Sequence, residues 1–272
     1  KKDNDRLGFF RPVISGVYSS IKNEHWDAVW FHGYNHHSII WAILLCKTLN
    51  IPFFMRMEAN LNFSPKGRWI KDQLINFIVK NAAGLLYIGK DNMDYYLSYE
   101  ADERKLFSMP YTVNNEFFQN LSNELKFKVD DEKKKLGLDK SLPIILYASK
   151  FIKRKNPVKL LEAFAKIAQD ENPPKAYLLY IGSGEDKVLL ENRIKELGWG
   201  ENVKLLGFKN QSELPLYISM CDVFVLPSNK EPYGLIVNEV LNCAKPVITT
   251  TEVGAAKDLI IHGENGFIYK PE

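Results

Sequence analysis

The chain has 272 residues and a formal net charge of +3, and 46% of its residues are hydrophobic, which is typical of a globular protein of about two domains. Its 36 basic and 33 acidic side chains are spread along the chain, so the charge gives no indication of nucleic-acid binding. No apolar run reaches the roughly 18 residues of a membrane-spanning helix, and Ser38–Leu45 comes closest.

The first half of the chain alternates short apolar strands with helix-like segments. We expect strands over Asp27–Phe31, Pro52–Met57, Gly84–Ile88 and Lys105–Ser108, and helices over Ser38–Leu49, Trp69–Asn81 and Asn92–Tyr99. Such alternation is typical of a parallel sheet covered by helices on both faces, and ligands bind such sheets at the carboxyl ends of the strands. The loops after those ends are therefore the candidate functional segments.

The loop after the first strand contains three histidines, His32, His36 and His37. His32 and His36 are four positions apart, so a metal site is one interpretation. Against it, Gly33 and Asn35 indicate a loop rather than a helix face, and no carboxylate or cysteine lies near in the sequence. The second interpretation is a turn whose histidines help to cap the following helix.

The loop after the second strand contains two charged side chains, Arg56 and Glu58, separated by Met57. Because successive side chains alternate along an extended chain, Arg56 and Glu58 share one side of it. Two interpretations follow: an ion pair satisfied without any substrate, or a pair of groups with a part in catalysis.

Residues 119–140 are polar and charged, which predicts a solvated connector between a first domain over 1–118 and a second over 141–272. We expect one surface helix in this connector, Asp130–Leu136, stopped by Gly137. Lys133–Lys135 are candidates for attraction to a membrane surface, but the acids just before them offset their field.

The second half of the chain alternates strands and helices again. We expect strands over Pro143–Ala148, Ala176–Ile181, Val203–Leu206, Val223–Leu226, Val247–Thr250 and Gly266–Tyr269. We expect helices from Gly182 to Leu197, from Leu214 to Cys221 and from Leu235 to Ala244, with turns at 254–258 and 263–266 around a further helix. The same class of parallel sheet is therefore predicted twice.

Cations are concentrated where the first strand of the second half ends. Lys150, Lys153, Arg154 and Lys155 place four cations in six residues, and such self-repulsion is costly unless an anion is shared. The functional interpretation is a clamp for a diphosphate. The alternative is an ordinary basic surface loop.

Two carboxylates, Glu231 and Glu239, lie eight positions apart around a turn that opens a helix. Glu231 comes before the helix and Glu239 on its second turn, so they face different parts of a ligand. Between them, the backbone amides of Gly234, Leu235 and Ile236 precede the first helical hydrogen bonds and can hold an anion. The alternative is a pair of solvated carboxylates at an ordinary helix start.

The stretch from Asp222 to Gly254 resembles the donor-site signature of retaining GT-B glycosyltransferases of the GT4 (group 1) type, in which a Glu-x7-Glu pattern surrounds a Phe/Tyr-Gly turn. The resemblance implies an α/β fold with two Rossmann-like domains whose parallel sheets face a cleft, the first domain being incomplete. It also implies a chain truncated at both ends, because family members begin with a strand and a glycine-rich loop and end with further helices.

The resemblance further implies transfer of a sugar, with retention at the anomeric carbon, from a nucleotide-diphosphate sugar to a glycan or lipid-linked acceptor. UDP and GDP are the expected nucleotides, and neither a metal nor another cofactor is required. The expected location is the cytoplasm, at the inner membrane face with peripheral membrane association, and the oligomeric state is left open. An odd number of separated cysteines, Cys46, Cys221 and Cys243, agrees with buried thiols in a reducing compartment.

Family roles fall on particular residues of this chain. Glu231 would bind and orient the sugar, and Glu239 would hold the ribose hydroxyls. Lys150 stands where the family has an arginine, and Lys155 stands at the family's lysine. Because lysine is a point charge without a bidentate grip, donor affinity is expected to differ. The family's other donor contacts, made largely through the backbone, fall on Gly182 and Phe208.

On the acceptor side, the resemblance assigns His32 to the cleft, a third interpretation for the histidine loop. Several relatives have a histidine where this chain has Glu58, so Glu58 and its neighbour Arg56 are held as acceptor-side candidates. The segment Tyr111–Asn114 stands where the family joins its two halves.

Three other functions fit parts of this pattern. A glycoside hydrolase also uses two carboxylates but does not need a cationic clamp. A nucleotide-sugar epimerase of the same fold would share the donor site, and product analysis without an acceptor would distinguish it. A non-catalytic donor-binding subunit is the third alternative, favoured by Glu58 at the histidine position.

Overall fold

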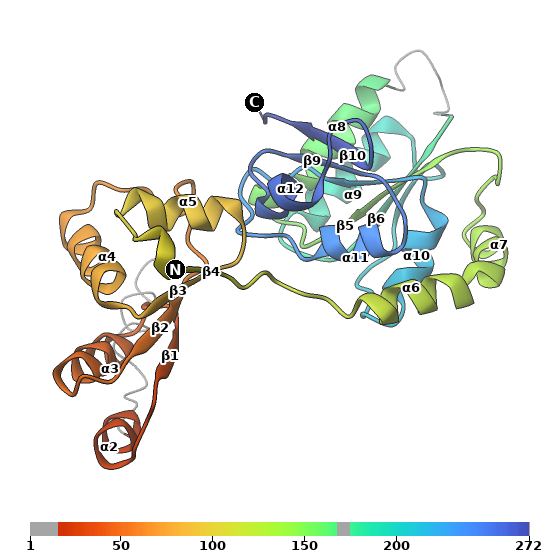
Figure 1. The fold of residues 1–272 in the computed structure, drawn as a ribbon. Coiled ribbons are helices and arrows are strands. Elements are labelled where there is room, and N and C mark those ends of the chain that lie inside the picture. The colour runs from red at the N-terminus through yellow and green to blue at the C-terminus, as the bar shows by residue number, and fades with distance from the viewer. Residues whose placement is uncertain (1–15, 168–174, 272) are drawn as a thin grey trace. The chain divides into compact units, whose positions relative to one another are not determined.

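The computed structural model describes residues 16–167 and 175–271, and the chain divides into two compact units between Tyr111 and Thr112 (Figure 1). Unit 1 ends at Tyr111 and unit 2 begins at Thr112. Each unit contains one sheet in which all paired strands are parallel. No helix among the described residues is long and apolar enough to cross a bilayer.

Unit 1 has a four-stranded sheet in the order β1-β2-β3-β4. Its strands are β1 (Val29–His32), β2 (Phe53–Arg56), β3 (Gly84–Tyr87) and β4 (Leu106–Ser108). Its helices are α2 (Gly16–Asn23), α3 (His37–Thr48), α4 (Trp69–Asn81) and α5 (Lys90–Ser98), with a 3-10 turn η1 (Glu103–Lys105). Because the chain adds strands in sequence order, the loops after β1 and β2 lie side by side at one edge of the sheet.

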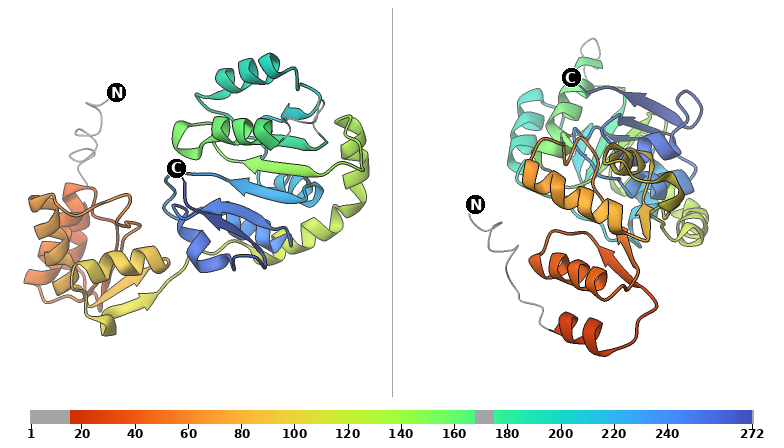
Figure 2. Two further views of the ribbon diagram at one scale, coloured as in Figure 1. Left: turned by 90° about the horizontal axis from the view of Figure 1, so that it is seen from above. Right: turned by 60° about the vertical axis from the view of Figure 1, so that its left-hand side comes forward.

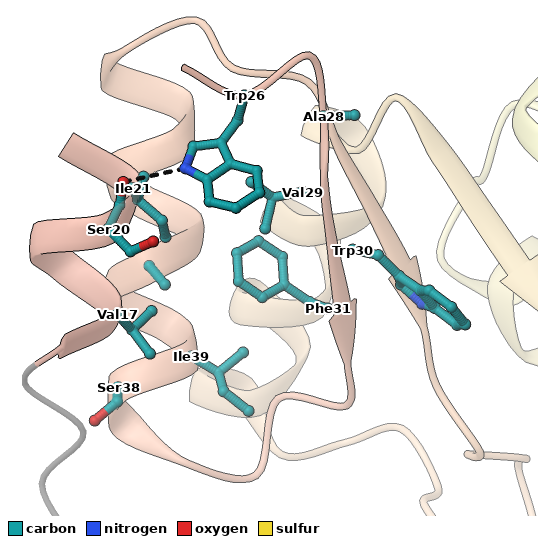
Figure 3. Close-up of a pocket in the computed structure, with 11 residues that line it drawn as sticks. Val17, Ser20, Ile21, Trp26, Ala28, Val29, Trp30, Phe31, Ser38 and Ile39 are labelled. Carbon is teal, nitrogen blue, oxygen red and sulfur yellow. Dashed lines mark hydrogen bonds between the residues drawn. The ribbon is translucent and has the colours of Figure 1, made fainter. Parts of the chain in front are cut away.

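The core of unit 1 forms where the helices lay their apolar faces on this sheet. Ala42, Ile43 and Cys46 of α3 are buried, as are Ile75 and Ile78 of α4. A cavity of about 400 Å³ lies between α2, β1 and α3 (Figure 3). Its lining is mainly apolar, and the indole of Trp26 closes one end by donating a hydrogen bond to Ser20 O at 3.1 Å.

Unit 2 has a six-stranded sheet in the order β10-β9-β8-β5-β6-β7. The strands are β5 (Ile144–Ala148), β6 (Tyr177–Ile181), β7 (Val203–Leu205), β8 (Val223–Leu226), β9 (Val247–Thr250) and β10 (Gly266–Tyr269). The chain starts in the middle at β5, builds outward to β7, then returns to β8 on the other side of β5. In such sheets the crevice outside the carboxyl ends of the two central strands is the usual ligand site.

The helices of unit 2 form two groups, seen on opposite faces of its sheet in Figures 1 and 2. The bounds are α6 (Asn115–Glu124), α7 (Lys126–Lys135), α8 (Pro157–Ile167), α9 (Lys187–Leu197), α10 (Leu214–Met220), α11 (Ile236–Asn242) and α12 (Gly254–Leu259), with a 3-10 turn η2 (Lys153–Lys155). Helices α8 and α9 contact each other, whereas α6 contacts α7, α10 and α11. The apolar faces of α8 and α9 bury Leu161, Phe164 and Leu190.

The predicted alternation and the Rossmann-like fold class are confirmed, and most predicted strands agree within two residues. Some details differ. The glycine-rich segment after β6 does not open a helix, because α9 begins only at Lys187. The helix expected over Leu235–Ala244 is the shorter α11, and the turn expected at 254–258 is wrong, because these residues lie within helix α12. Helices α6 and α8 were not expected. The three cysteines are free and buried, as expected.

The segment that the sequence suggested as a connector, 119–140, is largely helical in the structure. It contains the end of α6 and all of α7, and both helices contact α10 of unit 2. The unit boundary lies earlier, at Tyr111, than the predicted end of the first domain at residue 118. Helix α7 starts at Lys126, four residues before the predicted surface helix.

Two glycines allow the loop after β6 to touch the loop after β5. Gly182 has a φ of +138°, and a Cβ there would lie 2.0 Å from Ser149 O. At Gly184 a Cβ would lie 2.2 Å from Phe151 O. Phe151 N donates to Ser183 O at 2.9 Å, so the two loops are joined by backbone hydrogen bonds. Their close approach fixes the edge of the crevice.

We predict that Gly182→Ala lowers the free energy of unfolding by about 3 kcal/mol or more, because a left-handed backbone is occupied and a backbone oxygen must move. The matched control is Gly198→Ala, where φ is +70° but a Cβ would meet nothing within 4 Å. That control should lose only about 1 kcal/mol. Denaturant unfolding of both variants measures the difference, and equal losses would contradict the crowding at Ser149.

Candidate active site

The loops after β5 and β8 are fastened to each other at the centre of the unit 2 sheet. Asn156 Nδ2 donates to Pro227 O at 2.8 Å, and Asn229 Nδ2 donates to Asn156 Oδ1 at 3.3 Å. Asn229 N also donates to Arg154 O at 2.9 Å. Asn156 holds a left-handed conformation, with a φ of 53°, that turns the chain from η2 into α8. These bonds bring the cation-rich segment beside the segment that carries Glu231.

An ion-paired contact between Lys155 and Glu231 lies at the centre of this junction. Lys155 Nζ contacts Glu231 Oε2, and the two side chains are only 10% and 12% exposed. Arg154 Nη1 lies 3.3 Å from the same carboxylate oxygen and donates to Lys230 O at 2.9 Å. Two cations from the loop after β5 therefore share one carboxylate from the loop after β8.

The charge state of Lys155 is set by its surroundings. Burial, together with the charges of Arg154 and Lys150, lowers the pKa of Lys155 to about 8. The carboxylate of Glu231 is the counter-ion in contact with the ammonium group. Lys155 is thus charged at neutral pH but close to losing its proton, and an added anion would stabilise its charged form.

A cavity of about 660 Å³ adjoins this junction. The cation-bearing residues Lys150, Arg154 and Lys155 line one part of it. Gly182 and Ser183 line another part, and the remainder is lined by Ala148, Ser149, Ile181, Phe208, Lys209, Leu214 and Ile236. The structure therefore places Lys150, Lys155, Gly182, Phe208 and Ile236, all predicted from sequence, around one cavity.

Glu239 lies on α11, one turn beyond Ile236, and therefore on the same side of the helix. Its carboxyl group is partly buried, and desolvation raises the pKa of Glu239 to about 7. Among the described residues, no hydrogen bond or ion pair reaches this carboxylate. A half-desolvated carboxylate without a donor is suited to accept hydrogen bonds from hydroxyl groups.

Gly234 shapes the turn before α11. Its φ is +97°, and a Cβ would lie 3.0 Å from Val253 Cγ1 and 3.3 Å from Glu231 Cγ. Glu231 itself is held by a bridge to Val253, with Glu231 N donating to Glu252 O at 3.0 Å. The amide of Val237 donates a hydrogen bond to Gly234 O at 2.9 Å. The amides of Leu235 and Ile236 come before this first hydrogen bond of the turn.

This arrangement separates two kinds of chemistry. Lys150, Arg154 and Lys155 offer positive charge at one side of the cavity, where a polyanion would be held. Glu239 offers a carboxylate for neutral hydroxyl groups, while Glu231 lies against the cations. A ligand with both a diphosphate and a ribose or sugar matches these groups.

A second polar cluster lies in unit 1, at the carboxyl ends of β1 and β2. His32 Nε2 lies 3.3 Å from Glu58 Oε1, and Tyr111 Oη donates to the same oxygen. Arg56 stacks on the Tyr111 ring, with Cζ 4.7 Å from its centroid. The suggested Arg56–Glu58 ion pair is wrong, because Glu58 bonds His32 and Tyr111 instead. Burial and the Glu58 carboxylate raise the pKa of Tyr111 to about 12.

The histidine loop acts as a helix cap. His36 Nδ1 accepts a hydrogen bond from Ser38 N at 3.2 Å and caps α3, as one interpretation of the sequence predicted. His37 is the first residue of that helix, and His32 pairs with Glu58. Within residues 16–167 and 175–271, no group of three or more histidines, cysteines or carboxylates is arranged to hold a metal ion.

Sequence reasoning missed four residues that build these sites: Arg154, Asn156, Asn229 and Tyr111. Arg154 was counted among the cations but was not assigned a role. Asn156 and Asn229 could not be paired without the strand order, since they are 73 residues apart. An asparagine before a proline, as at Asn156-Pro157, is a known turn signal and was the only local indication.

Comparison with known families gives a match over the second part of the chain. The model of the family described as "Glycosyl transferases group 1" matches residues 128–272. N-acetyl-alpha-D-glucosaminyl L-malate synthase of Bacillus anthracis is 32% identical over 136 residues, 50% of this chain and 34% of that protein. An uncharacterized glycosyltransferase of Methanocaldococcus jannaschii is 31% identical over 157 residues, 58% of this chain. The chain spans 34% and 38% of the lengths of these two relatives.

Solved structures share the fold at low sequence identity. A crystal structure of HepE from Anabaena in complex with UDP has a TM-score of 0.75 at 18% identity, covering 94% of this chain and 67% of that one. A glycosyltransferase from Rickettsia africae has a TM-score of 0.73 at 20% identity, covering 99% of this chain and 67% of that one. These similarities confirm the predicted GT-B fold class.

We predict that Lys155 and Glu231 are energetically coupled, because each neutralises the other in a site with little water. A double-mutant cycle with Lys155→Met and Glu231→Gln should give a coupling of about 1–3 kcal/mol in the free energy of unfolding. The matched control is Lys187→Met with Glu191→Gln, an ion pair at 3.5 Å whose side chains are both 49% exposed. The Lys187–Glu191 control should show little coupling energy. An equally small coupling energy between Lys155 and Glu231 would contradict the prediction.

Proposed function

This chain belongs to the glycosyl transferases group 1 family, and from that premise we propose that it binds a nucleotide-diphosphate sugar and transfers the sugar with retention at the anomeric carbon. Unit 2 would hold the donor, and unit 1 would take part in holding the acceptor. UDP and GDP are the proposed nucleotides. The proposed acceptor is a glycan or a lipid-linked glycan.

One observation carries this proposal: the meeting of Lys155, Arg154 and Glu231 at the central crevice of the unit 2 sheet. The cations come from the loop after β5 and the carboxylate from the loop after β8. Between these two neighbouring strands the order in which the chain adds strands to the sheet reverses. A diphosphate that enters the adjoining cavity would meet Lys150, Arg154 and Lys155. A glycoside hydrolase has no use for such a group of cations.

In the proposed reaction, the bond between the anomeric carbon and the diphosphate oxygen breaks and leaves its electron pair on the diphosphate. Lys150, Arg154 and Lys155 stabilise the charge that develops there, which is electrostatic catalysis by preorganised groups. The acceptor hydroxyl attacks from the side of the leaving group, and its proton passes to the departing diphosphate oxygen. The products are the glycosylated acceptor and a nucleoside diphosphate.

Glu231 and Glu239 have separate proposed roles. Glu231 would bind and orient the sugar while remaining beside Lys155, so that the carboxylate links the donor sugar to the cations. Glu239 would accept hydrogen bonds from the ribose hydroxyls, and its partial desolvation supports that role. Gly182 and Phe208 line the same cavity and are proposed to face the nucleotide.

Two observations support the proposed acceptor side: a polar cluster in unit 1 and the name of one relative. His32, Arg56 and Glu58 cluster at the carboxyl ends of β1 and β2, the edge at which parallel sheets bind ligands. Relatives include an alpha-monoglucosyldiacylglycerol synthase of Acholeplasma laidlawii, 28% identical over 137 residues, whose name indicates a lipid product. A lipid-linked acceptor is therefore within the range of the family.

A thermal-shift panel of UDP, GDP, ADP and their sugars tests the proposal directly, because a ligand that binds the native state raises the unfolding temperature. We expect a shift with one nucleoside diphosphate and its sugar, and release of that diphosphate when an acceptor is added. Sugar released from a glycan without any nucleotide would favour a hydrolase. Formation of an isomerised nucleotide sugar in the absence of an acceptor would favour an epimerase. Binding of the nucleotide sugar without any turnover would favour a donor-binding subunit.

We predict that Glu239→Ala weakens binding of the preferred nucleoside diphosphate by about tenfold to a hundredfold, because the hydrogen bonds from the ribose to a charged acceptor are lost. Calorimetry should include the same nucleotide without its ribose hydroxyls as a control. The native protein should bind this dideoxy form more weakly, whereas the variant should bind both forms alike. Equal affinities for both forms in the native protein would show that Glu239 does not read the ribose.

We also predict a maximum in nucleotide affinity between about pH 7 and pH 8. The pKa of Glu239 is raised to about 7, so below that pH the carboxylate is protonated and accepts hydrogen bonds poorly. The pKa of Lys155 is lowered to about 8, so above that pH the ammonium group loses the charge that holds the diphosphate. Affinity should therefore fall on both sides of this window.

Two variants identify these limbs of the pH profile. Glu239→Gln, which does not titrate, should remove the fall on the acidic side, and Lys155→Arg should move the fall on the alkaline side to higher pH. A flat profile from pH 6 to pH 9, or limbs that survive both substitutions, would contradict the assignment.

A further inference from the structure

Arg56 is a buried arginine for whose guanidinium group the described part of the chain supplies no hydrogen-bond acceptor. It is the last residue of β2 and is 9% exposed. Its Nε is buried without a hydrogen-bond partner, and within 16–167 and 175–271 no carboxylate forms an ion pair with it. Arginine is seldom buried unless it is paired, because a buried unpaired charge is costly. Arg56 therefore needs an explanation beyond packing.

The carboxylate of Glu58 lies in the same cluster but does not pair with Arg56. Glu58 Oε1 accepts a hydrogen bond from Tyr111 Oη and lies 3.3 Å from His32 Nε2. The guanidinium group of Arg56 instead lies against the Tyr111 ring, with Cζ 4.7 Å from the ring centroid. An aromatic ring attracts a cation but supplies no oxygen lone pair to its N–H groups. The hydrogen-bonding capacity of Arg56 is thus left unused.

The strand end that carries Arg56 is held by hydrogen bonds. Gly33 N donates to Arg56 O at 2.8 Å and joins the end of β2 to the loop after β1. On either side of Arg56, Tyr96 Oη donates to Met55 O at 3.2 Å and accepts from Met57 N at 2.8 Å. A rigid strand end is a suitable support for a binding group, because the side chain starts from a fixed position.

The cluster around Arg56 is accessible from solvent through its other members. His32 is the register partner of Arg56 in the β1–β2 pair, so the two side chains lie on the same face of the sheet. The side chains of His32 and Glu58 are 54% and 44% exposed. A ligand that contacts His32 and Glu58 would therefore bring its substituents beside Arg56.

We propose that Arg56 binds an anionic group, a carboxylate or a phosphate, on the acceptor. The planar guanidinium group presents paired N–H donors that match either anion, whereas a neutral hydroxyl group would leave the buried charge uncompensated. This inference rests on the proposed function, in which unit 1 takes part in holding the acceptor. The acceptor would then be an acidic glycan that carries a uronic acid or a phosphorylated sugar beside the hydroxyl group that receives the new sugar.

NMR of the arginine side chains tests this proposal on the whole chain, with inorganic phosphate and malonate as probes. The Nε–H signal of Arg56, assigned by its absence in Arg56→Lys, should shift and saturate with at least one of these anions. Sodium chloride at equal ionic strength should not shift it. The anion that saturates the signal at the lower concentration identifies the group, a phosphate or a carboxylate.

The matched control is the Nε–H signal of Arg193, which already has a carboxylate partner. Arg193 Nε donates to Glu162 Oε1 at 2.7 Å, and Nη2 donates to Glu162 Oε2 at 3.1 Å. This signal should stay unchanged through the same titrations. An Arg56 signal that does not move, or that moves no more than the Arg193 signal, would overturn the proposal.

A stability measurement separates anion binding from a role in the fold. Arg56→Met removes the buried charge and keeps an apolar side chain, so it should raise the unfolding temperature of the anion-free protein. Arg193→Met, which breaks an ion pair, should not raise it. A lower unfolding temperature for Arg56→Met would show that the arginine serves the fold, and would count against the proposal.

The nucleotide separates this inference from the proposed function. With the preferred nucleoside diphosphate at saturation, the anion should still shift the Arg56 signal, because the donor has its own cations in unit 2. Loss of the shift would show that Arg56 binds the phosphates of the donor, and would overturn the inference while the proposed function stands. A shifted Arg56 signal in a protein that binds no nucleotide would support the anion site and contradict the proposed function.

Discussion

The contact between Lys155 and Glu231 is the interaction on which the rest of this site depends. The two residues are 76 positions apart, and they meet only because the chain begins the unit 2 sheet in its middle and later returns beside that first strand. The order of strands thus places a cation-rich loop against an acidic loop over a crevice. Hydrogen bonds of Asn156 and Asn229 also hold these loops together, so the geometry does not rely on the ion pair alone.

Electrostatics then give the site two parts: the cations line the cavity, and Glu239 lies on α11, one turn from the cavity-lining Ile236. Burial, and after it the charges of Arg154 and Lys150, lower the pKa of Lys155, so its ammonium group is held in a place where an added anion would stabilise it. Burial raises the pKa of Glu239 because its carboxylate is kept partly away from water, and no described residue donates a hydrogen bond to it. One ligand that carries phosphates and hydroxyl groups would relieve both shifts, which supports the proposed nucleotide sugar over a plain glycan.

Local sequence signals predicted the strands well, because buried parallel strands are short continuous apolar runs, as at Val223–Leu226. They also predicted that Lys150, Lys155 and Ile236 would meet around one cavity. Contacts between distant loops could not be predicted, since nothing in the sequence near Asn156 indicates Pro227 or Asn229 as a partner. The same limit explains Glu58, where alternation along a strand suggested Arg56 as its partner and the fold supplied His32 and Tyr111 instead.

A crystal structure of the chain with its preferred nucleoside diphosphate would test the central claim most directly. The terminal phosphate should lie within hydrogen-bonding distance of Lys155 Nζ and of the Arg154 guanidinium group, with the ribose hydroxyls bonded to Glu239. The central claim would be contradicted by a diphosphate bound away from the loops after β5 and β8, with Lys155 and Glu231 still in contact only with each other.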